Sequence, residues 1–151
     1  MQQFQYVRRF RELGIDDVPQ VGGKNASLGE MYRALSGAGV RVPNGFATTA
    51  QAYRDYLAYN DLHTRIQEVL AQLNVDDVEA LATSGAQIRG WIVDAELPPL
   101  LAGEITAAYA EMTAEYGDDT DVAVRSSATA EDLPDASLAG QQETYLNIRV
   151  T

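Results

Sequence analysis

The pattern of apolar and polar positions predicts a chain that is mostly helical in its middle. Leu28, Met31 and Leu35 recur at the spacing of a helix, which the glycine-rich stretch SGAG ends. Thr48 and Gln51 have the spacing of a capping box and open a further helix. The positions expected on the inner face of that helix are Ala52, Tyr53, Tyr56 and Leu57.

Three more helices follow, each with an apolar stripe. Asp76 or Asp77 is expected to cap the second of them, and Pro98 and Pro99 stand at the start of the third, where proline is tolerated. The stripes are Leu62, Ile66, Val69, Leu70 and Leu73; then Val78, Leu81, Ile88 and Ile92; then Leu101, Ile105, Ala108 and Met112. Residues 48–116 are therefore read as a helical block whose stripes pack into the core.

The two ends of the chain are typical of strands and turns. Residues 5–10 predict a short strand, and residues 40–46 predict an extended link that turns at Pro43-Asn44-Gly45. After the break at GDDTD, the alternation in residues 122–125 predicts a strand, and residues 143–148 predict another. The spacing from Thr129 to Asp132 permits a capping box and a short helix.

These elements predict an α/β (α+β) fold, with a small mixed sheet beside the helical block and residues 1–151 forming one domain. No internal repeat or low-complexity tract interrupts the chain. It stops directly after a predicted strand, with no closing helix. We therefore expect it to be part of a larger protein.

Composition and charge narrow the class of protein. The chain has 46% hydrophobic and 22% charged residues, as soluble globular proteins do, and its formal net charge is −11. Such a surface repels nucleic acid and anionic membranes, so neither is expected as a partner. The absence of cysteine excludes disulfides and thiol chemistry. With no apolar run of about 20 residues and no signal peptide, the sequence indicates a cytoplasmic protein.

Lys24, the only lysine, follows two glycines at the start of a predicted helix. A cation there opposes the helix dipole unless an anion lies between it and the first N–H groups. Gly22 and Gly23 would let backbone approach such an anion closely. The strict P-loop spacing is absent. The spacing alone therefore leaves a phosphate ligand and a solvated surface lysine equally open.

Arg125 ends the predicted strand at residues 122–125, with Ala123 on its face and Val122 and Val124 on the other. A guanidinium on the inner side of a sheet needs a partner, which could be a phosphate or one of the 22 acidic residues. The segment that follows is rich in small and hydroxyl residues that could surround a nucleotide or form an ordinary turn-rich surface. These residues are Ser126, Ser127, Thr129, Ser137, Gly140 and Thr144.

Other candidates have simpler explanations. His63, the only histidine, lies beside a helical stripe with no second ligand at a fixed spacing, so we expect no catalytic or metal role for it. Trp91 is expected to be partly buried packing. Paired acidic residues fall at turns and helix starts, where they cap and solvate, and they predict no metal site. The pairs are Asp16-Asp17, Asp76-Asp77 and Asp118-Asp119.

Three stretches closely resemble the start of phosphoenolpyruvate synthases, or pyruvate, water dikinases. They are VGGKNASLGEM, GVRVPNGFATTAQAYRDYL and VAVRSSATAEDLPDASLAGQQETYLNI, with GAQIRGWI between the second and third. The same ATP-binding module occurs in pyruvate, phosphate dikinases, whose strand reads more like VRSG, and in rifamycin phosphotransferases, which share SSATAEDLP. The stretches NASLGEM, NGFATTA and GAQIRGWI favour the synthases.

The resemblance implies one lobe of an ATP-grasp-like nucleotide-binding domain. It implies that Lys24 and Arg125 contact the nucleotide phosphates and that Gly140 and Thr144 also lie at the nucleotide. The ligands of Mg²⁺, the phosphorylated histidine and the pyruvate site are expected in parts that lie outside this chain. The implied reaction converts ATP, pyruvate and water to AMP, phosphoenolpyruvate and phosphate.

Two alternatives remain beside the synthase. One is a rifamycin phosphotransferase, and the other is a non-catalytic binding module. In either enzyme the second half of the nucleotide site would be missing from this segment. We therefore expect these 151 residues alone to lack dikinase activity and to bind ATP weakly or not at all.

Overall fold

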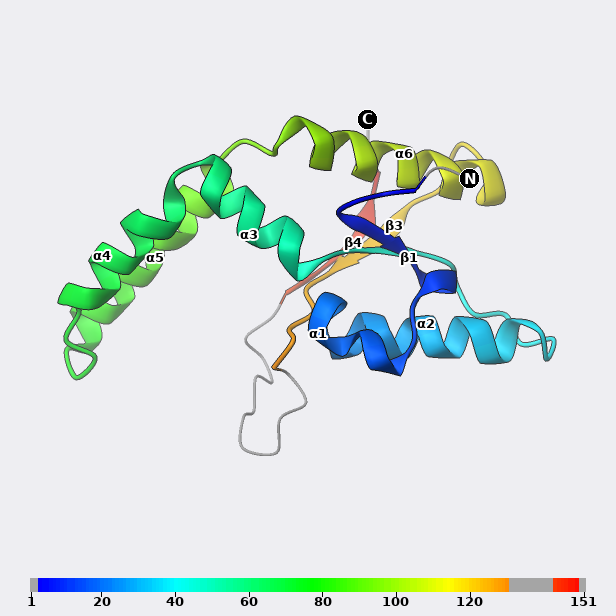
Figure 1. Ribbon diagram of the computed structural model, residues 1–151, viewed down its shortest axis with the longest axis horizontal. Helices are drawn as coiled ribbons and strands as arrows, with labels where there is room; N and C mark the ends of the chain where they lie inside the picture. Colours follow the sequence, from blue (N-terminus) through cyan, green and yellow to red (C-terminus); the bar gives the residue numbers. More distant parts are fainter. Residues whose placement is uncertain (1–2, 131–142, 150–151) are drawn as a thin grey trace. The chain divides into compact units, whose positions relative to one another are not determined.

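The computed structural model describes residues 3–130 and 143–149 (Figure 1). The chain divides into two compact units, residues 1–52 with 100–151 (unit 1) and residues 53–99 (unit 2). The elements are β1 (Val7–Arg9), 3₁₀ turns at Phe10–Glu12 and Ile15–Asp17, α1 (Val18–Val21), α2 (Gly23–Ser36), β2 (Phe46–Thr48), α3 (Ala50–Tyr59), α4 (Leu62–Gln72), α5 (Val78–Asp94), α6 (Pro99–Tyr116), β3 (Val122–Arg125) and β4 (Thr144–Ile148). The helices predicted between residues 24 and 116 are therefore confirmed, whereas the short helix permitted at residues 129–132 runs outside the described residues.

The strands form two separate antiparallel pairs, β1 with β2 and β3 with β4. The expected single mixed sheet is therefore wrong for the described residues. β1 is shorter than the predicted strand because the chain turns into a 3₁₀ helix at Phe10. β2 lies where an extended link was expected to end; its ladder joins Arg9 to Phe46 and Val7 to Thr48. That partner is distant in sequence, so the local pattern gave no sign of the pairing.

The strand at Val122–Arg125 is confirmed, and β4 begins one residue later than predicted. The β3–β4 ladder is irregular between Val122 and Val124, and Asn147 on β4 has a left-handed φ of 56°. Asparagine tolerates that conformation at a bulge. Arg125 is exposed. The expectation that it lies on the inner side of a sheet is therefore wrong for the described residues.

The core of unit 1 consists of three small clusters of buried side chains. They are Phe10, Leu13, Val21, Ala26 and Ala47; Phe4, Val7 and Ala108; and Tyr6, Ala52 and Leu101. The stripe predicted for α6 is confirmed, since Leu101, Ala108 and Met112 are buried. This helix therefore forms one wall of the core.

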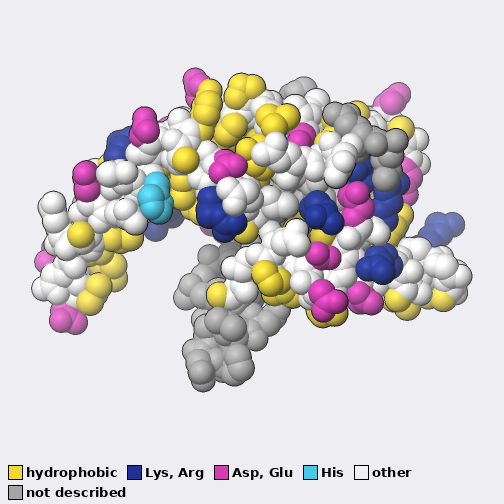
Figure 2. Space-filling model, in the orientation of Figure 1, with side chains coloured by type: hydrophobic (Ala, Val, Ile, Leu, Met, Phe, Trp, Pro, Cys, Tyr) yellow, Lys and Arg dark blue, Asp and Glu magenta, His cyan; other side chains and the backbone are white. Residues whose placement is uncertain are grey.

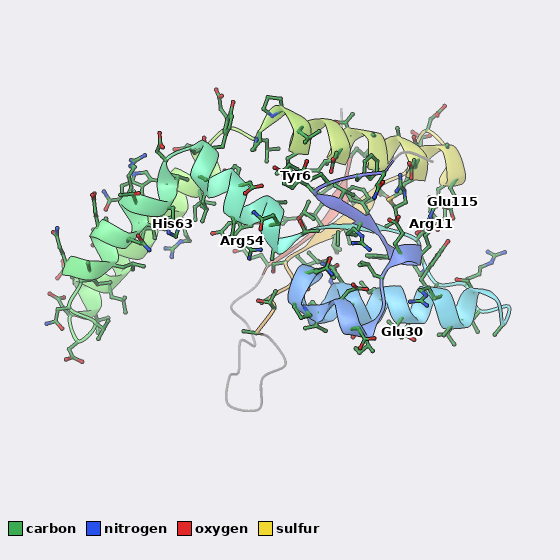
Figure 3. All side chains as sticks on the ribbon, viewed as in Figure 1. Tyr6, Arg11, Glu30, Arg54, His63 and Glu115 are labelled. Carbon is green, nitrogen blue, oxygen red and sulfur yellow. The ribbon has the colours of Figure 1, made fainter. Side chains whose placement is uncertain are left out.

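α2 packs through its small residues. Its buried positions are Gly23, Ala26 and Gly29, whereas Met31 and Leu35 are exposed. A Cβ at Gly29 would lie 2.4 Å from the Cβ of Leu13. The helix can therefore approach the preceding segment closely, and the Glu30 carboxylate accepts a hydrogen bond from the backbone N–H of Ile15 at 3.2 Å (Figure 3).

A buried carboxylate holds the N-terminal segment against α6. Glu104 is 5% exposed, and its two oxygens accept hydrogen bonds from three consecutive backbone N–H groups. The donors are Gln5 at 2.7 Å, Tyr6 at 2.7 Å and Val7 at 3.1 Å. Figure 3 labels Tyr6 beside α6. Charge-assisted bonds of this kind compensate for the burial of a carboxylate.

Arg9 on β1 makes a second link to α6. Its guanidinium donates to both carboxylate oxygens of Glu111, at 2.5 and 2.6 Å, and lies 4.3 Å from the centroid of the Phe4 ring. The hydrogen bond between the two side chains lowers the pKa of Glu111 and raises the pKa of Arg9. The bidentate geometry explains how the arginine is tolerated at 5% exposure.

The start of α3 differs by one residue from the predicted cap. The hydroxyl of Thr49, rather than Thr48, accepts the hydrogen bond from the backbone N–H of Ala52, at 3.1 Å. Ala52 is buried as expected, but Tyr53 is 52% exposed, so its inward placement is wrong. Tyr56 and Leu57 are half-buried.

Unit 2 contains α4, α5 and residues 53–59 of α3. The carboxylate of Asp77 accepts a hydrogen bond from Ala80 N at 3.0 Å, which confirms the predicted cap. The predicted seam of α5 holds only at its C-terminal end: Ile88 and Ile92 are half-buried, while Val78 and Leu81 are exposed. On α4, Leu62 is buried, Ile66, Val69 and Leu73 are half-buried, and Leu70 is exposed. A unit as small as residues 53–99 offers too little surface to cover every apolar position.

Hydrogen bonds join the C-terminal part of α3 and Asn60 to residues 92–96 at the end of α5. The hydroxyl of Tyr56 donates to the backbone carbonyls of Ile92 and Ala95. The amide side chain of Asn60 donates to the carbonyl of Glu96 at 2.9 Å and accepts from its N–H at 3.1 Å. Trp91 is half-buried, as predicted, and the guanidinium of Arg65 lies 4.1 Å from the centroid of its ring.

Candidate functional site

The α2 start, residues 22–25, follows directly on the short helix α1. Lys24 is half-buried and is the second residue of α2. The N–H of Gly22 donates to Val18 O, and the Asn25 amide donates to Val21 O, both at 2.9 Å. These bonds fix the turn from which the Lys24 side chain projects.

Gly22 adopts a backbone conformation that a side chain would not tolerate. Its φ is 80° and its ψ is 163°, a region occupied essentially by glycine. A Cβ there would lie 2.3 Å from Ser127 Oγ and 2.9 Å from Ala128 O. The close approach expected of this glycine is therefore made to the protein's own 126–128 loop, which follows β3.

Three hydrogen bonds join the α2 start to the 126–128 loop. They run from Gly23 N to Ala128 O (3.3 Å), from Lys24 Nζ to Ser126 O (3.4 Å) and from Asn25 N to Ser127 Oγ (3.5 Å). Two of the donors belong to the first-turn N–H groups that a helix leaves without intrahelical partners. The loop therefore caps α2.

This contact brings together the two motifs that the sequence singled out. The ammonium of Lys24 reaches the carbonyl of Ser126, which directly follows Arg125. In residues 3–130 and 143–149, Arg125 makes no ion pair, so no structural partner among the acids is found for it there. Two cationic side chains thus project from neighbouring parts of unit 1.

Thr144 joins the same region through the β-ladder. It is the register partner of Arg125 in the β3–β4 pair, and directly opposite residues in an antiparallel ladder project their side chains to the same face. Next to it, the hydroxyl of Tyr145 donates to the Glu143 carboxylate, and this bond raises the pKa of Tyr145. The fourth predicted residue, Gly140, lies outside the described residues, as do Ser137 and Asp132.

The remaining charged groups form no comparable arrangement. His63 is exposed on α4 (Figure 3). In the part of the chain that the structure describes, no three histidine or acidic side chains gather to hold a metal ion. Figure 2 shows Lys and Arg side chains scattered among acidic and apolar ones on the face in view. No helix over the described ranges is long and apolar enough to span a bilayer.

Asn25 and Ala128 also take part in this contact, although neither was predicted to do so. Asn25 contributes both a side-chain bond to α1 and a backbone bond to the loop. Asparagine near a helix start is a signal for such local bonding. Ala128 acts only through its carbonyl oxygen, which no sequence pattern can reveal.

A family model matches most of this chain. The family model described as pyruvate phosphate dikinase, AMP/ATP-binding domain, matches residues 18–151. Those residues include both the α2 start and the β3–β4 pair.

Several curated relatives carry the name phosphoenolpyruvate synthase. The chain is 62% identical over 145 residues to the protein from Pseudomonas aeruginosa, 60% over 144 residues to that from Neisseria meningitidis and 55% over 140 residues to that from Escherichia coli. These matches cover 96%, 95% and 93% of this chain but 18% of each relative. The chain thus spans about a fifth of the length of these relatives, and it belongs to the pyruvate phosphate dikinase AMP/ATP-binding domain family.

Proposed function

We propose that this segment is the nucleotide-binding part of a phosphoenolpyruvate synthase and that Lys24 and Arg125 hold the phosphates of ATP. The hydrogen bond from Lys24 Nζ to the carbonyl of Ser126 carries the proposal, because it puts the ammonium beside the residue that follows Arg125. The similarity to named synthases supports the choice of reaction.

The chemistry explains why two cations are needed. Phosphoryl transfer depends mostly on positioning and on neutralising the charge that develops on the phosphate oxygens. The Lys24 ammonium is a compact charge with three donors, while the planar Arg125 guanidinium can bind two phosphate oxygens at once. Together they would attract a polyanion to a chain whose net charge is −11.

Thr144 and Gly140 complete the proposed site within this chain. The Thr144 hydroxyl lies on the strand position opposite Arg125 and could bond to the same nucleotide. Gly140 would let backbone approach it. We infer that the fold is one lobe of an ATP-grasp-like domain, and that the ligands of Mg²⁺ come from outside this chain.

The full reaction would need parts beyond this chain. ATP, pyruvate and water would give AMP, phosphoenolpyruvate and phosphate, with the transferred phosphoryl group carried on a histidine in another domain. His63 is not that histidine in our proposal. The cytoplasm, where ATP and pyruvate occur together, is the proposed location.

The test uses a full-length synthase that carries this segment. We expect Lys24→Ala or Arg125→Ala to lower the rate of AMP formation by about 100-fold or more, as loss of a group that stabilises developing charge does. Arg41→Ala is the control, because Arg41 is exposed and its loss changes the net charge equally. Near-normal rates in the first two variants would refute the assignment.

The same protein separates the alternatives. Pyruvate-dependent AMP formation supports a synthase, whereas phosphorylation of a rifamycin in place of pyruvate would indicate the phosphotransferase. Nucleotide binding without either reaction would indicate a binding module.

A further inference from the structure

The 126–128 loop holds the α2 start in place through one side chain. Ser127 Oγ accepts the bond from Asn25 N and is also the atom nearest to where a Gly22 side chain would begin. The other two bonds use the backbone carbonyls of Ser126 and Ala128. Ser127 is therefore the place where a substitution can change the contact without changing either cation.

Each bond is long, at 3.3–3.5 Å, and so each is weak. Together, however, the three bonds fix the position of the α2 start relative to the end of β3. Lys24 belongs to α2 and Arg125 ends β3, and the described contacts that join these two chain segments are made at residues 22–25 and 126–128. The separation of the two cations is thus set where Gly22 meets Ser127.

We infer that Ser127 is a positioning residue: together with Gly22 it fixes the separation of Lys24 and Arg125 so that both bind one polyphosphate. This inference rests on the proposed function. Ser127 need not touch the nucleotide, because a small displacement of a binding group is enough to weaken its contribution.

A contact that serves only to stabilise the fold would behave differently. Its loss would lower the melting temperature of the protein and leave the contribution of Lys24 to ATP binding unaltered. A double-mutant cycle between Ser127 and Lys24 separates the two roles. If the two residues act together, the effects of their substitutions on the free energy of ATP binding are not additive.

The experiment measures ATP binding by calorimetry in the full-length protein that carries this segment. We expect Ser127→Ala to raise the Kd for ATP about three- to tenfold, because Lys24 and Arg125 would no longer be held at the separation that one polyphosphate needs. In the Lys24→Ala background the same substitution should change the Kd by less than about twofold. An equal change in both backgrounds would overturn the positioning role, as would a lowered melting temperature with an unchanged Kd.

Gly22→Ala provides an independent arm, with Gly39→Ala as its matched control. Both glycines have a φ of 80°, but a Cβ at Gly39 would meet nothing within 4 Å. The control therefore reports the effect of the backbone conformation without the contact to Ser127. We expect Gly22→Ala to weaken ATP binding and Gly39→Ala to leave it unchanged, and equal weakening would contradict the inference. The Ser127 cycle remains decisive if Gly22→Ala does not fold.

The two levels of proposal fail in different ways. If Lys24→Ala and Arg125→Ala bind ATP as the unaltered protein does, the proposed function fails. If those variants are impaired while Ser127→Ala binds normally, only the positioning role fails.

Discussion

Gly29 and Leu13 are in direct contact: a Cβ at Gly29 would lie 2.4 Å from Leu13 Cβ and 2.9 Å from its carbonyl oxygen. Leu13 is fully buried and so cannot move aside without disturbing the cluster that includes Phe10 and Val21. Glycine at this position therefore sets how closely α2 packs.

Gly29→Ala should lower the free energy of unfolding by about 1–3 kcal/mol, because overpacking outweighs the better helix propensity of alanine. Gly103→Ala on α6 is the matched control, since a Cβ there meets nothing within 4 Å. We expect the control to stabilise the protein by up to about 1 kcal/mol. Urea denaturation measures both, and a stabilising Gly29→Ala would contradict the packing described.

Glu104→Gln should destabilise the protein by about 1–3 kcal/mol, because an amide group replaces one acceptor oxygen and faces a backbone donor. The amides of Gln5, Tyr6 and Val7 should then exchange hydrogen faster, which NMR can follow residue by residue. Glu68→Gln on α4 is the control, since that side chain is exposed. Unchanged exchange at all three amides would show that the carboxylate does not hold this segment.

The Arg9–Glu111 pair should make stability depend on pH. The Arg9 guanidinium lowers the pKa of Glu111 below its ordinary value of 4.5, so the carboxylate stabilises the fold fully above that pH. This contribution is lost as the pH falls through the lowered pKa. The melting temperature of Glu111→Gln should therefore lie below that of the unaltered protein at neutral pH and approach it in acid.

The size of this effect should be modest, because the Glu111 side chain is 41% exposed and solvent screens the pair. Glu79→Gln, at an exposed position on α5, is the control and should leave the pH profile unaltered. A Glu111→Gln deficit that persists unchanged at low pH would assign the loss to packing.

Tyr56→Phe should destabilise unit 2 by about 1 kcal/mol, because the carbonyls of Ile92 and Ala95 lose their hydroxyl donor. Tyr53→Phe, three positions earlier, is the matched control, since Tyr53 is 52% exposed. Thermal denaturation of the two variants should separate them, and equal melting temperatures would refute the role of the Tyr56 hydroxyl.

Local pattern was enough to predict the helices and β3, because their signals lie within one stretch of sequence. It could not predict how α2 packs. Gly23, Ala26 and Gly29 are buried while Met31 is exposed, the reverse of what hydrophobicity suggests. A face made of small residues buries backbone rather than large side chains, so it leaves no hydrophobic stripe to read.

The candidate site was likewise only partly predictable from the sequence. Lys24 and Arg125 could be singled out from their motifs and from the family resemblance. The contact between the α2 start and the 126–128 loop could not, because it depends on backbone atoms of Ser126 and Ala128, which are far from α2 in sequence. The exposed position of Arg125 was likewise missed, since the alternation of a strand does not reveal whether its faces are covered.

The hydrogen bonds that join residues 5–7 to Glu104 also constrain the order of folding. The backbone N–H of Gln5 bonds to Glu104, which lies 99 residues later in the chain. Unit 1 therefore cannot complete its folding until most of this segment has left the ribosome. Unit 2 is one continuous segment, from Tyr53 to Pro99, so it can fold as soon as that segment has been synthesised. Because local contacts form faster than distant ones, unit 2 should fold first during synthesis, and unit 1 should fold after it.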